Sequence, residues 1–203
     1  MVRTKGRLTS SSGLSVVVDQ VVWCRGSNGN VGTSLDGGRN WTWTQVKCFE
    51  KADFRDIEAF DYNTAIIMGI GEPAFILKTA DGGNTWKTVF ENKTSGMFLD
   101  AMEFFDGKSG IVIGDPIKGR FFLARTSNQG ESWKELPYGE LPSSDSGEAC
   151  FASSGTNIRT LYGVEACFVS GGNNSRYFSS GFNAPLPIVH GTKSTGANSI
   201  AVS

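Results

Sequence analysis

A turn that ends in tryptophan occurs three times in this chain of 203 residues. Each copy reads Ser/Thr-x-Asp/Asn-x-Gly-x-x-Trp. The defined positions are Ser34, Asp36, Gly38 and Trp41; Thr79, Asp81, Gly83 and Trp86; and Thr126, Asn128, Gly130 and Trp133. The Asp or Asn position recurs after 45 and then 47 residues. Such a period is typical of a repeat protein, in which each small module needs its neighbours for stability.

The pattern predicts a hairpin turn with a structural role. An Asp or Asn side chain accepts hydrogen bonds from backbone N–H groups a little further along the chain, and glycine supplies a positive φ. The tryptophan then begins the next strand and offers an apolar face to a neighbouring module. These residues resemble the Asp-box, or BNR repeat. That resemblance implies structural turns on the rim of a β-propeller, away from any active site.

Each repeat contains four short apolar runs, which predict the four antiparallel strands of a propeller blade. The blades are expected at about 14–50, 54–94, 98–140 and 147–190, with a further one starting in 196–203. Their first strands are predicted at Leu14–Val18, Ile57–Phe60, Ala101–Phe105, Ala149–Ala152 and Ser199–Val202. The fourth repeat lacks both the acid and the tryptophan, so we expect a looser turn over Ser179–Pro185.

The expected fold class is therefore an all-β propeller. Almost no helix is predicted, because no segment keeps a 3.6-residue apolar period. Four blades and one strand fall short of a larger propeller of roughly six to eight blades. We expect the chain to be part of such a propeller, or an arc that another chain completes, because an open arc exposes two apolar blade faces. A four-bladed ring with an extra strand is the alternative.

Charge and hydropathy exclude several classes of function. The net charge is −1 with the charges interspersed, which does not suggest a nucleic-acid or anionic-membrane partner. No apolar run approaches 18 residues, so no membrane span is predicted. The run Leu14–Val18 is too short for a secretory signal, so no signal peptide is predicted in the given sequence. His190 is the single histidine and is expected in a loop, which argues against His-based triads.

The four cysteines show no CxxC spacing, so zinc and thioredoxin-like chemistry are not predicted. Cys150 and Cys167 fall on runs that are expected to form neighbouring antiparallel strands, which makes a disulfide between them geometrically possible. Free, buried thiols are the favoured interpretation. No metal or cofactor is predicted, because the chain lacks a D-x-D-x-D-G calcium loop and a quinone or flavin fingerprint.

From about Leu14 onward the blade pattern resembles bacterial relatives of the photosystem II stability/assembly factor, a BNR-like propeller family. The segments Asp53–Asp56 and Ser154–Asn157 look like motifs of its non-photosynthetic bacterial members. The resemblance implies a chaperone-like binding module and an extracytoplasmic location, periplasmic or secreted. Sialidases also carry the repeated turn, but the early Arg-Ile-Pro motif that they need is absent from this sequence.

Several acids lie where the strands enter the predicted channel. At an offset of 44 residues, Asp56 aligns with Asp100 at the start of a first strand, and Glu148 follows 48 residues later. The loops between second and third strands add further acids beside prolines. The candidate ligand-binding residues are Arg55, Asp56, Glu72, Asp100, Asp115 and Glu148. These positions are expected to share the channel-mouth face of the propeller, where loops on a rigid scaffold commonly bind a ligand.

Two classes of function fit these residues. The first is a non-catalytic binding or assembly module for a protein or a glycan. The second is a glycoside hydrolase that uses two of Asp56, Asp100 and Glu148 as its paired carboxyl groups. A propeller-type oxidoreductase is a weaker alternative, because its cofactor fingerprint is missing. A purely structural interpretation also stands, in which these acids accept hydrogen bonds from turn N–H groups and solvate a wet channel.

Overall fold

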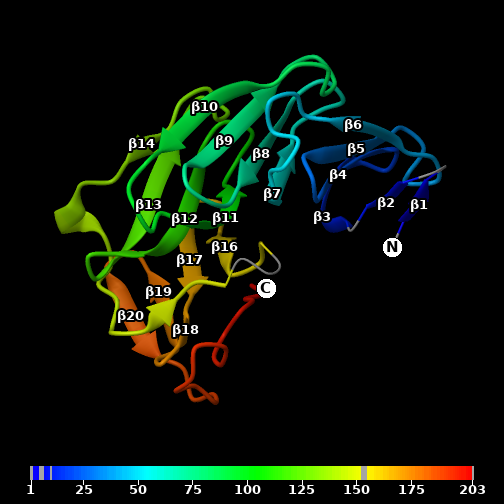
Figure 1. Cartoon of the computed structure of the whole chain (residues 1–203). Coiled ribbons are helices and arrows are strands. Elements are labelled where there is room, and N and C mark those ends of the chain that lie inside the picture. The colour runs from blue at the N-terminus through cyan, green and yellow to red at the C-terminus, as the bar shows by residue number, and fades with distance from the viewer. Residues whose placement is uncertain (1, 5–6, 10, 152–154, 203) are drawn as a thin grey trace. The chain divides into compact units, whose positions relative to one another are not determined.

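The computed structural model describes residues 2–4, 7–9, 11–151 and 155–202, and it is all-β as predicted (Figure 1). The chain divides into two compact units, an N-terminal unit of Met1–Asn92 and a C-terminal unit of Lys93–Ser203. Each unit contains two four-stranded antiparallel sheets whose strands follow one another in chain order. The helical part of the described chain is the short 3₁₀ helix η1 (Tyr138–Glu140). No helix in the described residues is long and apolar enough to cross a membrane.

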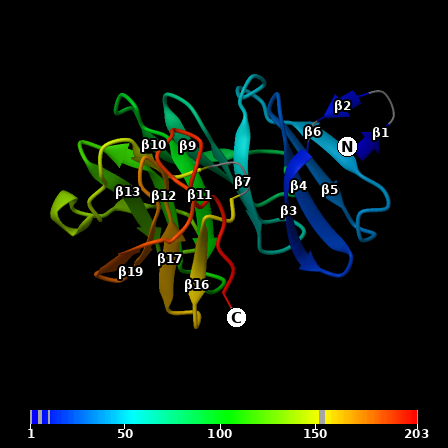
Figure 2. The same cartoon turned by 90° about the horizontal axis from the view of Figure 1, so that it is seen from below.

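The N-terminal unit holds the first and second sheets. The strands of the first sheet are β3 (Ser11–Val18), β4 (Val21–Gly26), β5 (Asn30–Ser34) and β6 (Thr42–Gln45), of which β3, β4 and β5 lie side by side in Figure 2. Those of the second sheet are β7 (Phe54–Ala59), β8 (Ala65–Gly69), β9 (Ala74–Thr79) and β10 (Lys87–Asn92). The short strands β1 (Val2–Thr4) and β2 (Arg7–Thr9) pair separately.

The two sheets of this unit stack face to face. Trp23 of the first sheet is fully buried and belongs to one apolar cluster with Ile57, Ala59 and Ile67 of the second sheet. Two hydrogen bonds cross the same contact: the Ala59 N–H donates to Ser15 Oγ at 3.0 Å, and Trp23 Nε1 donates to the carbonyl of Asp61 at 3.2 Å. The indole body therefore contributes apolar burial while its N–H stays paired.

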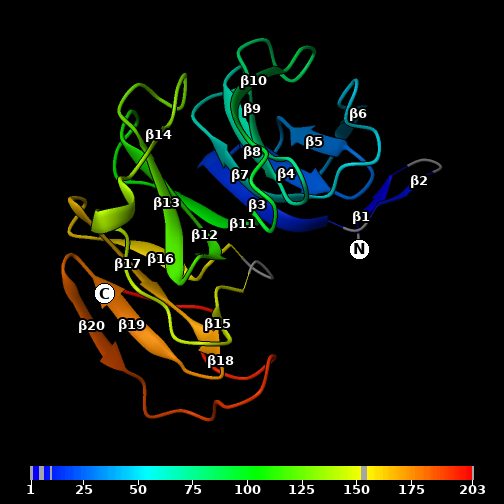
Figure 3. The same ribbon diagram turned by 60° about the vertical axis from the view of Figure 1, so that its left-hand side comes forward.

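The C-terminal unit holds the third and fourth sheets, which Figure 3 shows together. The third is β11 (Leu99–Phe104), β12 (Gly110–Ile117), β13 (Arg120–Thr126) and β14 (Lys134–Glu135). The fourth is β16 (Ile158–Leu161), β17 (Glu165–Val169), β19 (Arg176–Ser179) and β20 (Phe182–Pro185). The two-residue strands β15 (Glu148–Ala149) and β18 (Gly171–Gly172) pair beside it. Phe168 and Phe178 stack at 4.5 Å in the core between the two larger sheets.

The repeated turns connect the third and fourth strands of the first three sheets. In the first turn, Asp36 Oδ1 accepts hydrogen bonds from Ser34 Oγ and from the backbone N–H of Asn40, both at 2.8 Å. Trp41 Nε1 donates to the Gly38 carbonyl at 2.8 Å. In the third turn, Asn128 Oδ1 accepts from Thr126 Oγ1 at 2.9 Å and from the Ser132 N–H at 3.1 Å. An amide oxygen thus accepts the same two hydrogen bonds as the carboxylate.

The structure corrects two local predictions in the fourth repeat, the position of the first strand and the pairing of Cys150 with Cys167. Of the strand expected at Ala149–Ala152, Ala149 belongs to β15, Cys150 and Phe151 lie outside any strand, and residue 152 is not described. The first strand of the fourth sheet is β16, because the chain leaves the sheet after β15 and returns at Ile158. Arg159, not Cys150, pairs with Cys167, and all four cysteines are free.

The end of the fourth repeat also differs from expectation. The prediction of a looser turn over Ser179–Pro185 is wrong. Ser179 pairs directly with Phe182, so Ser180 and Gly181 form a two-residue turn, with Gly181 at φ 70°, and β20 follows at once. A tight hairpin of this kind needs positive φ, which glycine adopts at little cost. Residues 199–202 form no strand in the described structure, where the Ile200 N–H donates to the Thr156 carbonyl at 2.8 Å.

Candidate functional site

The candidate acids do not occupy equivalent positions in their strands. In β7, Phe54 pairs with Gly69 and Asp56 with Met68, so the bulge between these pairs falls on Arg55. In β11, the corresponding bulge between Leu99 and Ala101 falls on Asp100. Asp100 therefore corresponds to Arg55, and the alignment at an offset of 44 is one residue off. A β-bulge inserts one unpaired residue into a strand, which the sequence pattern alone does not reveal.

In the N-terminal unit, the candidate residues Arg55 and Asp56 lie near a buried arginine that sequence reasoning missed. Arg25 of β4 is 1% exposed, and its Nη1 donates to the Phe54 carbonyl at 2.8 Å. Burial lowers the pKa of Arg25, and the charge of Asp56 opposes this shift. Gly13 makes room for the guanidinium, because a Cβ there would lie 2.5 Å from Arg25 Nε. The sequence signal that could have revealed Arg25 is a basic residue inside an otherwise apolar strand.

Arg55 and Asp56 are themselves engaged locally. Arg55 Nη2 lies 3.2 Å from Asp53 Oδ2, and both side chains are partly exposed. Asp56 Oδ1 accepts a hydrogen bond from the backbone N–H of Ile57 at 2.9 Å. These contacts agree with the structural interpretation of the acids, because a partly exposed ion pair contributes little to stability or to ligand binding by itself.

A groove of about 430 Å³ lies next to these residues in the same unit. The aromatic rings of Phe49 and Phe75 pack at 4.7 Å on its wall, together with Ile70 and Pro73. Its charged residues are Lys51, Asp53, Glu72 and Glu91. One predicted ligand residue, Glu72, thus lines the groove, and Arg55 contacts the groove through Asp53. An apolar cavity with a few charged side chains is the usual form of a recognition site.

In the C-terminal unit, three predicted acids gather around Cys150. Asp115 Oδ1 accepts a hydrogen bond from the Cys150 N–H at 3.0 Å. Burial raises the pKa of Asp115. Burial also raises the pKa of the Cys150 thiol, and the charges of Asp100, Asp115 and Glu148 raise it further. Such a group of nearby acids disfavours negative charge on the Cys150 thiol.

Asp100 is the most isolated member of this group. Its side chain is fully buried, and neither carboxyl oxygen has a hydrogen-bond partner among the described residues. Burial, followed by the charge of Asp115, raises the pKa of Asp100 well above its ordinary value. The nearby N–H of Asp115 opposes the shift, although it donates its hydrogen bond to the Phe98 carbonyl at 3.0 Å. The geometry therefore favours a neutral carboxylic acid at this position.

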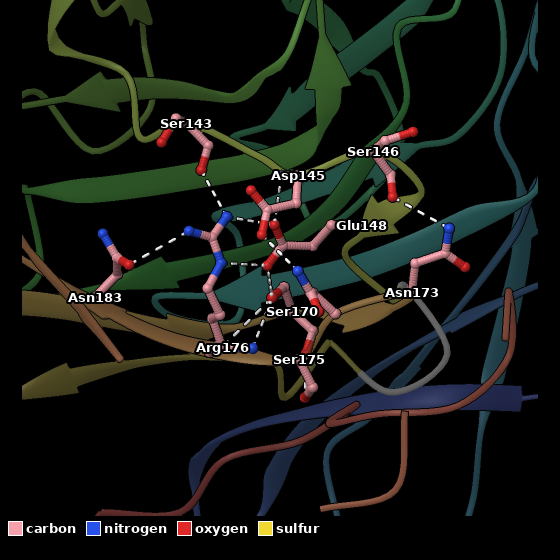
Figure 4. A network of polar contacts seen from close by, with 10 residues as sticks. Ser143, Asp145, Ser146, Glu148, Ser170, Asn173, Ser175, Arg176 and Asn183 are labelled. Atoms are coloured by element: carbon pink, nitrogen blue, oxygen red, sulfur yellow. Dashed lines mark hydrogen bonds and ion pairs between the residues drawn. The ribbon is translucent and has the colours of Figure 1, made fainter. Parts of the chain in front are cut away.

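Glu148 forms a buried ion pair with Arg176 of β19, at the centre of the network in Figure 4. Oε1 accepts from Arg176 Nε at 2.9 Å and from Ser170 Oγ, and Oε2 accepts from Arg176 Nη2 and from the Asp145 N–H at 2.8 Å. Hydrogen bonding to Glu148 is the main cause of the raised Arg176 pKa. Both carboxylate oxygens are thus occupied by positioned donors.

Each unit therefore holds its own group of predicted residues. Asp56 and Glu72 lie in the N-terminal unit, and Asp100, Asp115 and Glu148 lie in the C-terminal unit. A common axis for the two groups stays a prediction. No group of three or more His, Cys, Asp or Glu side chains in the described residues could hold a metal ion.

A second groove, of about 540 Å³, lies in the C-terminal unit. Phe105 and Val164 line it together with Arg125 and Lys134. Arg125 pairs with Lys134 across β13 and β14, so two cations face each other directly. Sequence reasoning did not single out these residues. The groove is a competing location for a ligand.

Comparisons with known proteins agree with this architecture. The sequence model of the family described as "Photosynthesis system II assembly factor YCF48" matches residues 11–134. The chain is 31% identical, over 107 residues, to the chloroplastic photosystem II stability/assembly factor HCF136 of Arabidopsis thaliana. That match covers 49% of this chain and 24% of the Arabidopsis protein, so the chain spans only a part of its curated relative.

Three solved structures share the fold at low sequence identity. A YCF48 bound to D1 peptide matches with a TM-score of 0.59 and 19% identity, over 87% of this chain and 54% of that one. YCF48 from Cyanidioschyzon merolae gives 0.58 and 16%, over 87% and 56%. The GH74 enzyme of Niastella koreensis gives 0.57 and 16%, over 92% and 26%. At these identities the likeness concerns the fold alone, because one fold hosts many functions.

Proposed function

This chain belongs to the photosynthesis system II assembly factor YCF48 family, and we propose that it is a non-catalytic module that binds a segment of a partner protein during the assembly of a complex. The family relationship supports an assembly role. The peptide in the related YCF48 complex supports a protein ligand rather than a glycan. The observation on which the proposal depends is the groove of the N-terminal unit.

The groove has the chemistry that an extended peptide needs. Phe49, Phe75 and Pro73 offer apolar surface for one bulky side chain of the partner. Asp53, Glu72 and Glu91 outnumber Lys51 around that surface, so the groove favours a peptide with a basic residue beside its apolar one. We propose that Glu72 and Lys51 set this charge preference, while the aromatic wall supplies most of the affinity.

The acids of the C-terminal unit support a non-catalytic role. A glycosidase needs one carboxyl group that can donate a proton and a second that can act as a base or nucleophile. Glu148 accepts hydrogen bonds from Arg176, Ser170 and the Asp145 N–H, so its oxygens are already committed. Asp100 is fully buried and therefore closed to a sugar substrate. The shared fold of the GH74 enzyme does not alter this argument.

A peptide array tests the proposal. We would screen labelled peptides that place an aromatic or aliphatic residue beside Lys or Arg, and then measure binding of the hits by fluorescence anisotropy. For a peptide with a basic residue, Lys51→Glu is expected to raise the affinity about tenfold and Glu72→Lys to lower it about tenfold. For the same peptide with an acidic residue in that position, both effects are expected to reverse. Lys47→Glu is the matched control, because Lys47 is exposed in the same loop and does not line the groove.

Two results would count against the groove. One is the absence of any peptide that binds above background. The other is an equal effect of Lys47→Glu and Lys51→Glu, which would indicate a response to net charge alone. Loss of binding on Arg125→Glu, with no effect of the substitutions at Lys51 and Glu72, would place the ligand in the second groove instead.

A further inference from the structure

Two exposed cations face each other in the second groove, which lies in the C-terminal unit and has a volume of about 540 Å³. Arg125 of β13 pairs directly with Lys134 of β14 and with Ile111 of β12. Residues directly opposite one another in antiparallel strands share a face of the sheet, and Ile111 packs in the core with the fourth sheet. Both cations therefore lie on the face of the third sheet that is turned toward the fourth. Gly163 and Val164, from the turn between β16 and β17, also line the groove.

Neither cation has a partner among the described residues. Arg125 and Lys134 form no ion pair and no side-chain hydrogen bond there. Glu135, the acid next to Lys134 in the chain, pairs with Ala124 and therefore points to the other face of the sheet. Like charges directly opposite each other destabilise a sheet, so an anion held between Arg125 and Lys134 removes a repulsion.

The acids of the same groove are already bonded. Asp106 Oδ1 accepts hydrogen bonds from two backbone N–H groups of its own turn, both at 2.6 Å. Glu165 Oε1 accepts from Ser179 Oγ and from the Ser180 N–H at 2.7 Å. These carboxylates are held by local donors, so they do not bind the two cations, although their charges remain close to the groove.

The repeated turn does not require this basic pair. The pair occupies the position before the Ser or Thr of the turn and the position after its tryptophan. In the first sheet these positions are Thr33 and Thr42, which also pair and also line a groove, of about 310 Å³. In the second sheet they are Lys78 and Lys87, of which Lys78 is buried. The turn therefore does not explain two exposed cations in the third sheet.

An apolar slot of about 240 Å³ adjoins the second groove. The slot and the groove share Arg125 and Ser180. Leu123 and Phe168 line the slot, and so does Glu140, which is exposed in η1. A ligand whose charged head lies at Arg125 can therefore place an apolar body in the slot.

We propose that the C-terminal unit binds a small carboxylic acid with an apolar chain, whose carboxylate lies between Arg125 and Lys134 and whose chain enters the slot. The guanidinium fork of arginine matches the two oxygens of a carboxylate. A phosphate group carries roughly −1.5 to −2 charges at pH 7, which the nearby Asp106 and Glu165 disfavour more than the single charge of a carboxylate. The site uses other residues and another ligand than the peptide groove of the N-terminal unit, so the two proposals stand or fall separately.

NMR titration of the whole chain with straight-chain carboxylates from acetate to hexanoate tests the proposal. Hexanoate is expected to bind with a dissociation constant of about 1 mM and to shift the amide signals of Arg125 and Val164. The affinity is expected to rise about threefold to fourfold for each methylene group that enters the slot. Arg125→Gln and Lys134→Gln are each expected to weaken hexanoate binding by at least about fivefold. The uncharged 1-hexanol is expected to bind at least about tenfold more weakly than hexanoate.

Lys108→Gln is the matched control, because Lys108 is exposed next to the groove residue Ser109 but does not line the groove. Circular dichroism of every variant establishes that the sheets remain folded. The absence of shifts at Arg125 and Val164 with about 20 mM hexanoate would overturn the proposal. So would an equal loss of binding on Lys108→Gln, or an affinity for 1-hexanol equal to that for hexanoate.

Two further arms separate a carboxylic acid with an apolar chain from other anions. Inorganic phosphate is expected to bind more weakly than hexanoate. Phosphate that binds as tightly as hexanoate would overturn the proposal, because that result indicates a site for a bare oxoanion. Equal affinities of acetate and hexanoate would also overturn it, because the chain would then not enter the slot.

Discussion

At the scale of single residues, the repeated turn is governed by local chemistry. A Ser or Thr hydroxyl, an Asp or Asn oxygen and a positive-φ glycine lie within five positions, so each turn closes through its own hydrogen bonds. Such contacts depend on sequence spacing alone, and they could be predicted. The buried Asp100 carboxyl, which has no hydrogen-bond partner among the described residues, could not be predicted, because its burial depends on strands that lie far away in the sequence.

Substitution of Asp36 tests the turn chemistry. Asp36→Asn is expected to unfold near the wild-type temperature, because Asn128 already shows that an amide oxygen serves in this position. Asp36→Ala removes the acceptor of Ser34 Oγ and of the Asn40 N–H, so it should lower the midpoint of thermal unfolding. Equal midpoints for the two variants would contradict this account of the turn.

The same carboxylate has a testable titration. Hydrogen bonds from the backbone and side chain of Asn40 and from Ser34 lower the pKa of Asp36 to about 2. Because the folded value lies below the ordinary value of 3.8, these bonds add stability above pH 3.8, and this contribution is lost as the pH falls towards 2. NMR titration of the Asp36 carboxyl carbon measures the midpoint. A midpoint near 3.8 would show that the turn does not hold the carboxylate.

Asp100 is expected to show the opposite pH dependence. Its pKa is raised in the folded state by burial and by the charge of Asp115, with Cys150 and Glu148 also nearby. The folded protein thus binds this proton more tightly than the unfolded chain, and stability falls as the pH rises through the folded pKa. Asp100→Asn removes the ionisation. The thermal unfolding midpoints of the variant and the wild type are measured at about pH 5 and at about pH 8. The variant's midpoint relative to that of the wild type should be higher at about pH 8 than at about pH 5. A constant difference would argue against a buried acid.

At the scale of strands, the sequence predicted which segments form strands better than it predicted how those strands pair. The apolar runs located the first strands of the first three sheets, because strand periodicity is a local signal. The bulges at Arg55 and Asp100 shift the pairing by one residue without changing that signal, so the equivalence of Asp56 and Asp100 was misjudged. The break between β15 and β16 was missed although the segment 153–157 is rich in the loop-forming residues Ser, Gly, Thr and Asn, because the run Ala149–Ala152 before it was predicted to be the first strand.

The Glu148–Arg176 pair is expected to fix β15 against β19. Glu148→Ala leaves Arg176 without its carboxylate in a largely buried position, which costs roughly 3–5 kcal/mol of unfolding free energy. Hydrogen exchange of the amides of Glu148 and Ala149 should become faster before that of β11. Glu140→Ala is the control, because Glu140 is exposed in η1. If Glu148→Ala unfolds at the denaturant midpoint of the wild type, the ion pair contributes little to the free energy of unfolding.

At the scale of the whole molecule, the repeats place four similar sheets in two units. Within each unit, one sheet buries its face on the next through large apolar side chains such as Trp23 and Phe168. The fold class followed from the period of the turns. The groove did not, because Phe49, Pro73 and Phe75 come from a connection, a loop and a strand that only the tertiary structure brings together.

Hydrogen–deuterium exchange with and without a bound peptide tests the central claim most directly. If this chain is a protein-binding module that uses the groove of its N-terminal unit, a peptide found by screening should slow exchange at Lys51–Asp53 and Gly71–Glu72. The repeated turns should exchange at unchanged rates. Protection confined to the C-terminal unit around Arg125 and Lys134, with none at the N-terminal groove, would contradict the claim.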